Sequence, residues 1–166
     1  SMHTIRLRGP WSVEPVTRFV LHPDGSYRPT EDDLPPAARA TMPADWSALF
    51  GVGFLGRVRY RRTFNKPTGL DGGERVFLVV EQQRSEVCIT MKQRLVGHVY
   101  AGEPAGRFDI TDRLEDHNQL ELIVDHPAVE LIAEHPVFKA LQSRVGDPEK
   151  LLCGGLVGEV RLEIEE

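Results

Sequence analysis

Residues 97–114 of the chain read GHVYAGEPAGRFDITDRL, and apolar segments lie on both sides of them. The segment that leads in predicts a hairpin, with strands over 86–91 and 94–99 joined by a turn at Lys92 and Gln93. The segment that follows, 119–124, alternates apolar and polar side chains. Successive side chains of a strand point to opposite faces, so this stretch indicates antiparallel strands with one buried face.

The same period of two recurs along most of the chain. The side chains that it predicts for the interior are Val58, Tyr60, Leu120, Leu122, Val160 and Leu162. Segment 75–80 is apolar nearly throughout, which is typical of a strand covered on both faces. Eight or more such strands separated by turns predict an all-β fold, a jelly-roll β-sandwich of two antiparallel sheets, in one domain over 1–166.

Two segments interrupt the strand pattern. Residues 23–43 are rich in Pro, Asp and Ala and lack periodicity, so we expect a long surface connection there. Residues 126–145 carry prolines suited to first-turn positions and apolar residues at helical spacing, which predicts a short helical insertion.

Three segments, taken in order, resemble a known family. They are 56–64 (GRVRYRRTF), 97–114 and 154–162 (GGLVGEVRL). Together they are similar to the N-terminal sugar-binding domain of glycoside hydrolase family 2, the β-galactosidase and β-glucuronidase family. The resemblance implies a galactose-binding-like jelly roll without catalytic carboxylates, since the family carries both of those on a separate barrel domain. Residues 126–153 do not match the family pattern and are interpreted as an insertion.

A sugar site needs an aromatic ring against a pyranose face and planar polar groups for the hydroxyls. The sugar-binding candidates are His98, Tyr100 and Glu103 in the 97–106 loop, together with Trp46. We expect Tyr100 to stack on the ring and Glu103 to accept hydrogen bonds from hydroxyls. For Trp46, packing of its loop against the sandwich is the alternative, and Trp11 on an early strand is expected in the core.

Two features depart from the resembled family. In that family the 97–106 loop reaches towards the catalytic pocket, with an acidic residue where this chain has Ala101. The family's usual Asn-Gly turn is replaced here by Lys92 and Gln93. The resemblance therefore specifies the fold more closely than the sugar.

The arginines of segment 57–62 divide between the two faces. Arg57, Arg59 and Arg61 alternate onto the outer face, where a solvated strand surface is the expected reading. Arg62 points inward, and a buried guanidinium requires partners. We therefore predict that Arg62 is mostly buried and pairs with an Asp or Glu carboxylate or with several backbone carbonyls.

Residues 51–56 (GVGFLG) match the dinucleotide fingerprint G-x-G-x-x-G. That motif works between a strand and a helix, because the helix N-terminus meets the pyrophosphate. Here a loop precedes it and a predicted strand follows, so we interpret it as a loop entering a strand.

The composition of the chain indicates which classes of binding partner are to be expected. A net charge of −5 argues against a nucleic-acid binder, and no apolar run reaches the roughly 18 residues of a membrane span. No secretory signal is recognised, which favours the cytoplasm and leaves a secreted or periplasmic location open. Cys88 and Cys153 are expected as free thiols. We expect no cofactor; galactose-binding-like sandwiches sometimes hold a structural calcium ion, and no ligands for one are assigned here.

The sequence thus predicts a non-catalytic carbohydrate-binding domain whose partners are a weakly bound carbohydrate or the catalytic domain of a glycosidase. No catalytic residue is assigned, because no spacing here specifies the paired carboxyls of a glycosidase. The alternative is a structural or protein-interaction β-sandwich that has lost sugar binding.

Overall fold

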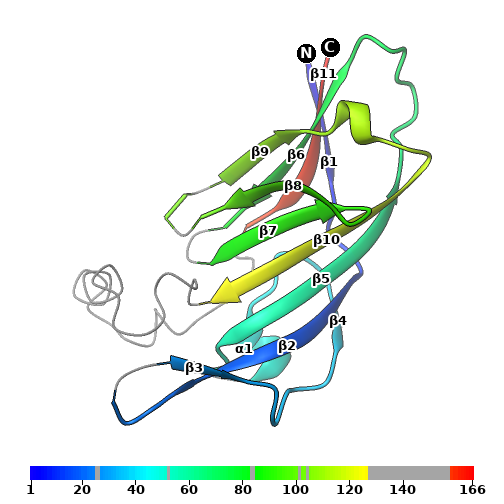
Figure 1. Ribbon diagram of the computed structural model, residues 1–166. Helices are drawn as coiled ribbons and strands as arrows, with labels where there is room; N and C mark the ends of the chain where they lie inside the picture. Colours follow the sequence, from blue (N-terminus) through cyan, green and yellow to red (C-terminus); the bar gives the residue numbers. More distant parts are fainter. Residues whose placement is uncertain (25–26, 52, 83–84, 101, 104, 127–157) are drawn as a thin grey trace.

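The computed structural model describes residues 1–24, 27–51, 53–82, 85–100, 102–103, 105–126 and 158–166. Two antiparallel sheets face one another, which confirms the predicted β-sandwich (Figure 1). The four-stranded sheet has the order β1 (Met2–Arg6), β11 (Val160–Glu165), β6 (Arg75–Glu81), β9 (Ala105–Asp109). The seven-stranded sheet has the order β3 (Tyr27–Thr30), β2 (Trp11–Leu21), β5 (Gly56–Asn65), β10 (His117–His126), β7 (Glu86–Met91), β8 (Arg94–Val99), with β4 (Ala38–Ala40) paired to β2.

The core lies between the sheets and contains every side chain predicted for it. All six are between 0% and 2% exposed: Val58, Tyr60, Leu120, Leu122, Val160 and Leu162. Leu122 is central, because β10 places it opposite Tyr60 of β5 and Ile89 of β7. β6 is buried on both faces over most of its length, as its apolar run predicts.

The β7–β8 turn shows why a hairpin forms without Asn-Gly. Lys92 and Gln93 both adopt positive φ, 49° and 66°, which is the twist that a two-residue hairpin loop requires. The Lys92 amide also donates to the Gln119 carbonyl oxygen at 3.1 Å. The neighbouring strand β10 therefore supports a turn that the residue types alone disfavour.

Two expectations from sequence need correction, and two others concern residues outside the described ranges. Segment 23–43 is not a plain connection, since it contains the short strands β3 and β4. The strand β9 begins within the loop expected at 97–106, and the 3-10 helix η1 (Thr111–Arg113) follows it. His126 ends β10, whereas the rest of the predicted helix at 126–145 lies outside the described residues, as does Cys153.

The Phe108 side chain of β9 packs against two glycines, Gly97 of β8 and Gly106 of β9. Its ring lies where a Cβ on Gly97 or Gly106 would sit, at 2.3 Å and 2.7 Å from its nearest ring atoms. Glycine at both positions therefore lets the ring pack flat against the backbone of β8 and β9. A glycine-rich segment thus becomes a strand here through a contact that sequence periodicity does not reveal.

The fingerprint-like segment 51–56 has no dinucleotide context. The short helix α1 (Trp46–Phe50) precedes it, capped by the Asp45 carboxylate, which accepts from the Ser47 amide at 2.8 Å. Strand β5, not a helix, begins at Gly56. No helix in the described part of the chain is long and apolar enough to cross a membrane.

Asp109, at the end of β9, gives a pH-dependent contribution to stability. Thr111 donates its hydroxyl and its amide to this carboxylate at 2.6 Å and 3.0 Å, and Arg75 donates to it at 2.9 Å, so the pKa of Asp109 falls to about 2. A carboxyl whose folded pKa lies below its unfolded value stabilises the fold at neutral pH and loses that effect as pH falls towards 2.

We expect Asp109→Asn to lower the free energy of unfolding by less than about 1 kcal/mol near neutral pH, because solvent screens this half-exposed pair. The difference should vanish at about pH 2, where wild-type Asp109 is also becoming neutral. Urea unfolding at both pH values measures it, with Asp112→Asn, whose side chain is 89% exposed, as the control. An equal loss at both pH values would show that charge is not the cause.

Candidate functional site

A buried glutamine fixes the loop that carries the sugar-binding candidates. Gln82 is 1% exposed, and its side-chain amide donates to the backbone carbonyls of Tyr100 at 2.9 Å and Glu103 at 2.8 Å. Its side-chain oxygen accepts from the Ser85 amide at 2.8 Å. One side chain therefore joins the end of β6, the start of β7 and the loop after β8.

The outer surface of this loop is small and polar. Tyr100 is 48% exposed, and its ring centroid lies 5.6 Å from that of His98, with the planes tilted by 31°. Glu103 is exposed, and its amide donates to the Tyr100 carbonyl at 3.0 Å. The structure thus brings together an aromatic ring, an imidazole and a carboxylate-bearing residue at one end of β8.

Trp46 does not join them. It is 1% exposed, its indole N–H donates to the Tyr60 hydroxyl at 2.6 Å, and Phe54 packs edge-on against it at 5.5 Å. The packing alternative accounts for Trp46, since no face of its ring is open to a pyranose. Trp11 is fully buried as expected, with its N–H donating to the Leu7 carbonyl at 2.8 Å.

A buried polar cluster under this end of the sandwich was missed from sequence. Gln82, Ser85, Asp125 and His126 are all at most 6% exposed, and the Ser85 hydroxyl lies 3.5 Å from His126 Nδ1. Asp125 holds Arg57 through two hydrogen bonds of 2.7 Å and 3.0 Å, and these raise the pKa of Arg57. Buried polar groups need partners, so this cluster fixes how the strand ends meet.

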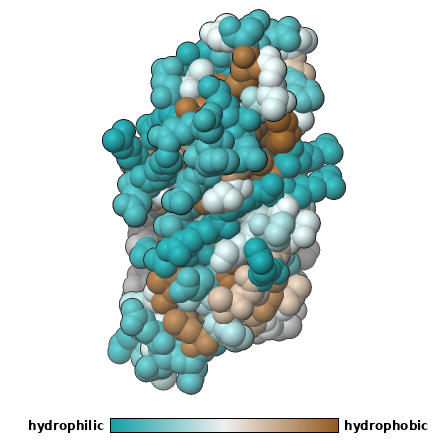
Figure 2. Space-filling model, turned by 90° about the vertical axis from the view of Figure 1, so that its right-hand side faces the viewer, coloured by the Kyte–Doolittle hydropathy of each residue, from teal (hydrophilic) through white to brown (hydrophobic). Residues whose placement is uncertain are grey.

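The outer face of the seven-stranded sheet carries paired charges. Arg59 lies within 3.9 Å of Glu14 and 3.8 Å of Glu121, and Arg61 donates to Glu121 at 3.1 Å. These arginines face outward as predicted, but carboxylates of the neighbouring strands partner them. The surface on the right of Figure 1 is mainly hydrophilic, with small separate hydrophobic patches (Figure 2).

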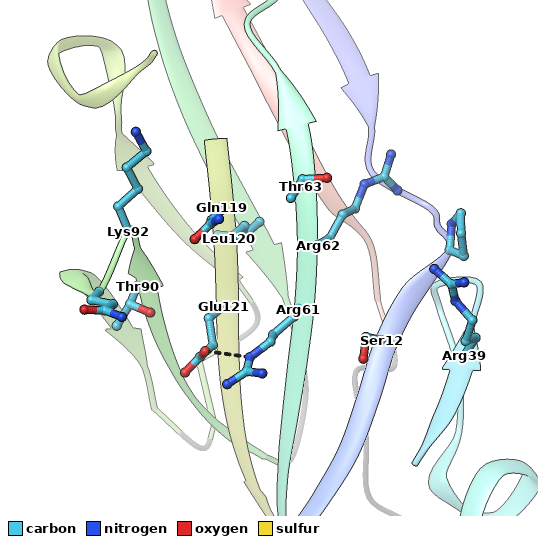
Figure 3. Close-up of a pocket in the computed structure, with 12 residues that line it drawn as sticks. Ser12, Arg39, Arg61, Arg62, Thr63, Thr90, Lys92, Gln119, Leu120 and Glu121 are labelled. Atoms are coloured by element: carbon cyan, nitrogen blue, oxygen red, sulfur yellow. Dashed lines mark hydrogen bonds and ion pairs between the residues drawn. The ribbon is translucent and has the colours of Figure 1, made fainter. Parts of the chain in front are cut away.

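A groove of about 820 Å³ lies on this outer face, across β4, β2, β5, β10 and β7 (Figure 3). Hydroxyl and amide side chains line its floor: Ser12, Thr63, Thr90, Gln93 and Gln119. Its charged residues are Arg39, Arg61, Arg62, Lys92 and Glu121. Four cations and one carboxylate give the groove a net charge of +3 in a chain of net charge −5.

The prediction for Arg62 is wrong. Its residue is half-buried, and within the described residues neither a carboxylate nor a backbone carbonyl pairs with it. The buried Nη1 has no hydrogen-bond partner, and burial lowers the pKa of this guanidinium. The pleat does turn Arg62 inward, but the neighbours that it meets there include Leu7 and Leu162, which offer no acid.

The described residues of the loop and the groove do not form a metal-binding site. In the described ranges, no three His, Cys, Asp or Glu side chains gather closely enough to hold a metal ion. Cys88 is a free thiol on β7, and burial raises its pKa. What the loop and the groove offer instead is stacking, hydrogen bonding and charge.

Comparisons with known proteins bear on the fold. No protein-family model matches the chain, and no curated protein sequence does either. Among solved structures, an FMN-binding β-glucuronidase from Faecalibacterium prausnitzii L2-6 matches with a TM-score of 0.68 and 22% identity, over 98% of this chain and 22% of that one. A β-glucuronidase from Bifidobacterium dentium matches with a TM-score of 0.68 and 19% identity, over 99% of this chain and 30% of that one.

A third match is a β-glucuronidase from an uncultured Clostridium species, with a TM-score of 0.66 and 15% identity, over 99% of this chain and 29% of that one. The chain therefore spans less than a third of the length of each of these proteins. At such identities the likeness concerns architecture alone. The chain has a β-sandwich fold that is also present in these β-glucuronidases.

Proposed function

We propose that this chain is a non-catalytic carbohydrate-binding domain that works beside a glycosidase catalytic domain. The observation that carries the proposal is the half-exposed Tyr100 ring, held by the Gln82-anchored loop beside His98 and Glu103. A fixed aromatic ring next to hydrogen-bonding groups is what a pyranose needs. The shared sandwich of the β-glucuronidases supports the same reading at the level of the fold.

In this proposal each group has a role. The exposed face of Tyr100 stacks on the apolar face of a sugar ring, and the Glu103 carboxylate accepts hydrogen bonds from hydroxyls. His98 supports one side of the tyrosine ring and offers a further polar edge. Of the aromatic residues that the structure describes, Tyr100 is the exposed one, so the contact area is small and binding is weak.

Substituting the loop side chains tests the proposal. We expect Tyr100→Ala to weaken binding of galactose, glucuronate or a short oligosaccharide by about tenfold or more, since stacking on the sugar ring and most of the contact area are lost with the tyrosine ring. Glu103→Ala should weaken it less. Chemical-shift titration measures both, and Leu95→Ala is the control, because this 56% exposed residue lies on β8 outside the loop.

Binding that neither loop substitution affects would remove this loop from consideration. We also expect no turnover of nitrophenyl glycosides by the purified chain, because hydrolysis needs two carboxyls held about 5–9.5 Å apart across a sugar. Turnover would overturn the non-catalytic assignment.

The protein-interaction alternative rests on a different observation. β8 is an edge strand of the seven-stranded sheet, and its Leu95 is 56% exposed. An edge with exposed apolar side chains can pair with a partner strand. Silence towards every sugar, together with Leu95→Ala weakening association with a glycosidase catalytic domain, would favour this function.

A further inference from the structure

The groove on the outer face is built by the strand register. Arg39 of β4 pairs with Ser12 of β2, and Ser12 pairs in turn with Arg61 of β5. Arg61 pairs with Glu121 of β10, and Glu121 with Thr90 of β7. Residues directly opposite in antiparallel strands share a face. These five side chains therefore form one row across five strands, about 19 Å long at the usual strand spacing.

The cations of the groove are not equally neutralised. Arg61 is paired with Glu121, and Lys92 is paired with Glu115. Arg39 is exposed, and no hydrogen bond or ion pair with any described residue engages it. Arg62 likewise lacks a partner in the described part of the chain, and its Nη1 is buried. Two guanidinium groups are thus left uncompensated.

Both groups line the groove, although the pleat turns Arg62 towards the side of β5 opposite to Arg61. Figure 3 shows Arg62 and Arg39 on the side of the groove away from Lys92. A second cation nearby adds to the cost of an unpaired and partly desolvated guanidinium. An anion held between Arg39 and Arg62 would offset both costs, because a guanidinium binds a carboxylate or a sulfate through parallel hydrogen bonds.

The uncharged residues that line the groove indicate which kind of molecule would carry the anionic group. Ser12, Thr63, Thr90 and Gln119 offer hydroxyl and amide groups, which suit sugar hydroxyls. Among the described residues no aromatic side chain lines the groove, so these residues do not supply the stacking platform on which single-stranded nucleic acids rely. We propose that the groove binds an acidic oligosaccharide across the strands, with a carboxylate or sulfate group between Arg39 and Arg62.

This inference rests on the proposed function and specifies its ligand class. It uses a surface apart from the Tyr100 loop, so the two can be tested separately. The probes are tetragalacturonic acid and a heparin-derived tetrasaccharide, which distinguish carboxylate from sulfate, with maltotetraose as the neutral sugar and an oligothymidylate as the anion without sugar hydroxyls. Calorimetry and chemical-shift titration on the full chain measure binding.

We expect an acidic tetrasaccharide to bind more tightly than maltotetraose, and rising salt to weaken it. Arg39→Gln combined with Arg62→Gln should weaken acidic binding by about tenfold or more, because two charge-assisted contacts are lost. Arg28→Gln on β3 is the matched control, since this exposed arginine lies outside the groove. Arg39→Gln alone, at an exposed position, keeps the test valid if the double variant folds poorly.

Equal affinity for acidic and neutral tetrasaccharides, with Tyr100→Ala weakening both, would overturn the groove proposal and leave the loop function standing. Acidic binding that depends on the arginines but not on Tyr100 would support the groove and remove the loop. Arginine-dependent binding of the oligothymidylate as tight as that of the acidic sugars would overturn the sugar preference. Absence of binding to any of the sugars would overturn both proposals.

Discussion

Leu122→Ala is expected to lower the free energy of unfolding by about 2–5 kcal/mol, the range for truncating a large core side chain. Leu122 is fully buried on β10, between Tyr60 of β5 and Ile89 of β7. Paired strands on both sides prevent the neighbours from closing the cavity, so lost contacts add to lost burial. Urea unfolding followed by tryptophan fluorescence measures the change, since Trp11 and Trp46 are both buried.

The adjacent residue supplies the control for this substitution. Ile123 lies next to Leu122 on β10 but faces outward and is only half-buried. Ile123→Ala removes a side chain of similar size and should cost clearly less. Equal losses for the two substitutions would mean that the assignment of faces along β10 is wrong.

Gln82→Leu is expected to destabilise the protein by about 2–4 kcal/mol and to release the loop after β8. The substitution leaves the Tyr100 and Glu103 carbonyls and the Ser85 amide without the partner that Gln82 provides. Each buried polar group left unsatisfied costs about 1–3 kcal/mol, and the two loop carbonyls recover part of that from solvent. Urea unfolding measures the stability, and amide exchange at Glu103 measures the loop.

Gln119→Leu is the matched control, because it makes the same chemical change at an exposed position of β10. It should shift stability by no more than about 0.5 kcal/mol. If Gln82→Leu proved equally mild while amide exchange at Glu103 stayed slow, other contacts would hold the loop, and the assignment of Gln82 as its anchor would fail.

The fold was predictable for strands whose own sequence alternates between apolar and polar residues. The alternation along β5, β10 and β11 identifies their buried faces, since a period of two decides which side chains point inward. β9 was not predictable in this way. Its Gly106 reads as a turn residue, and the side chains of Val99 and Phe108 packed against it explain why glycine is needed in a strand.

The candidate site was predictable only in part, for a related reason. His98 and Tyr100 are two residues apart on an extended segment, so their shared side follows from periodicity, and their rings do meet. Gln82 reads as an ordinary loop residue after a strand, and its burial arises from contacts with a segment about twenty residues away. For Arg62, periodicity predicts that the side chain points inward, but it does not predict whether a carboxylate lies within reach.

The pairing of β1 with β11 has a consequence for the order of the chain. Met2 lies opposite Glu165, and the Glu166 amide donates to the Ser1 carbonyl at 3.4 Å, so both ends leave the sandwich side by side (Figure 1). A short linker joining them would preserve every strand pair. New ends opened at the exposed bend around Gly69 and Gly72, between β5 and β6, would interrupt neither sheet. The architecture thus admits a circular permutation, in which strand order along the polypeptide changes while the layers stay the same.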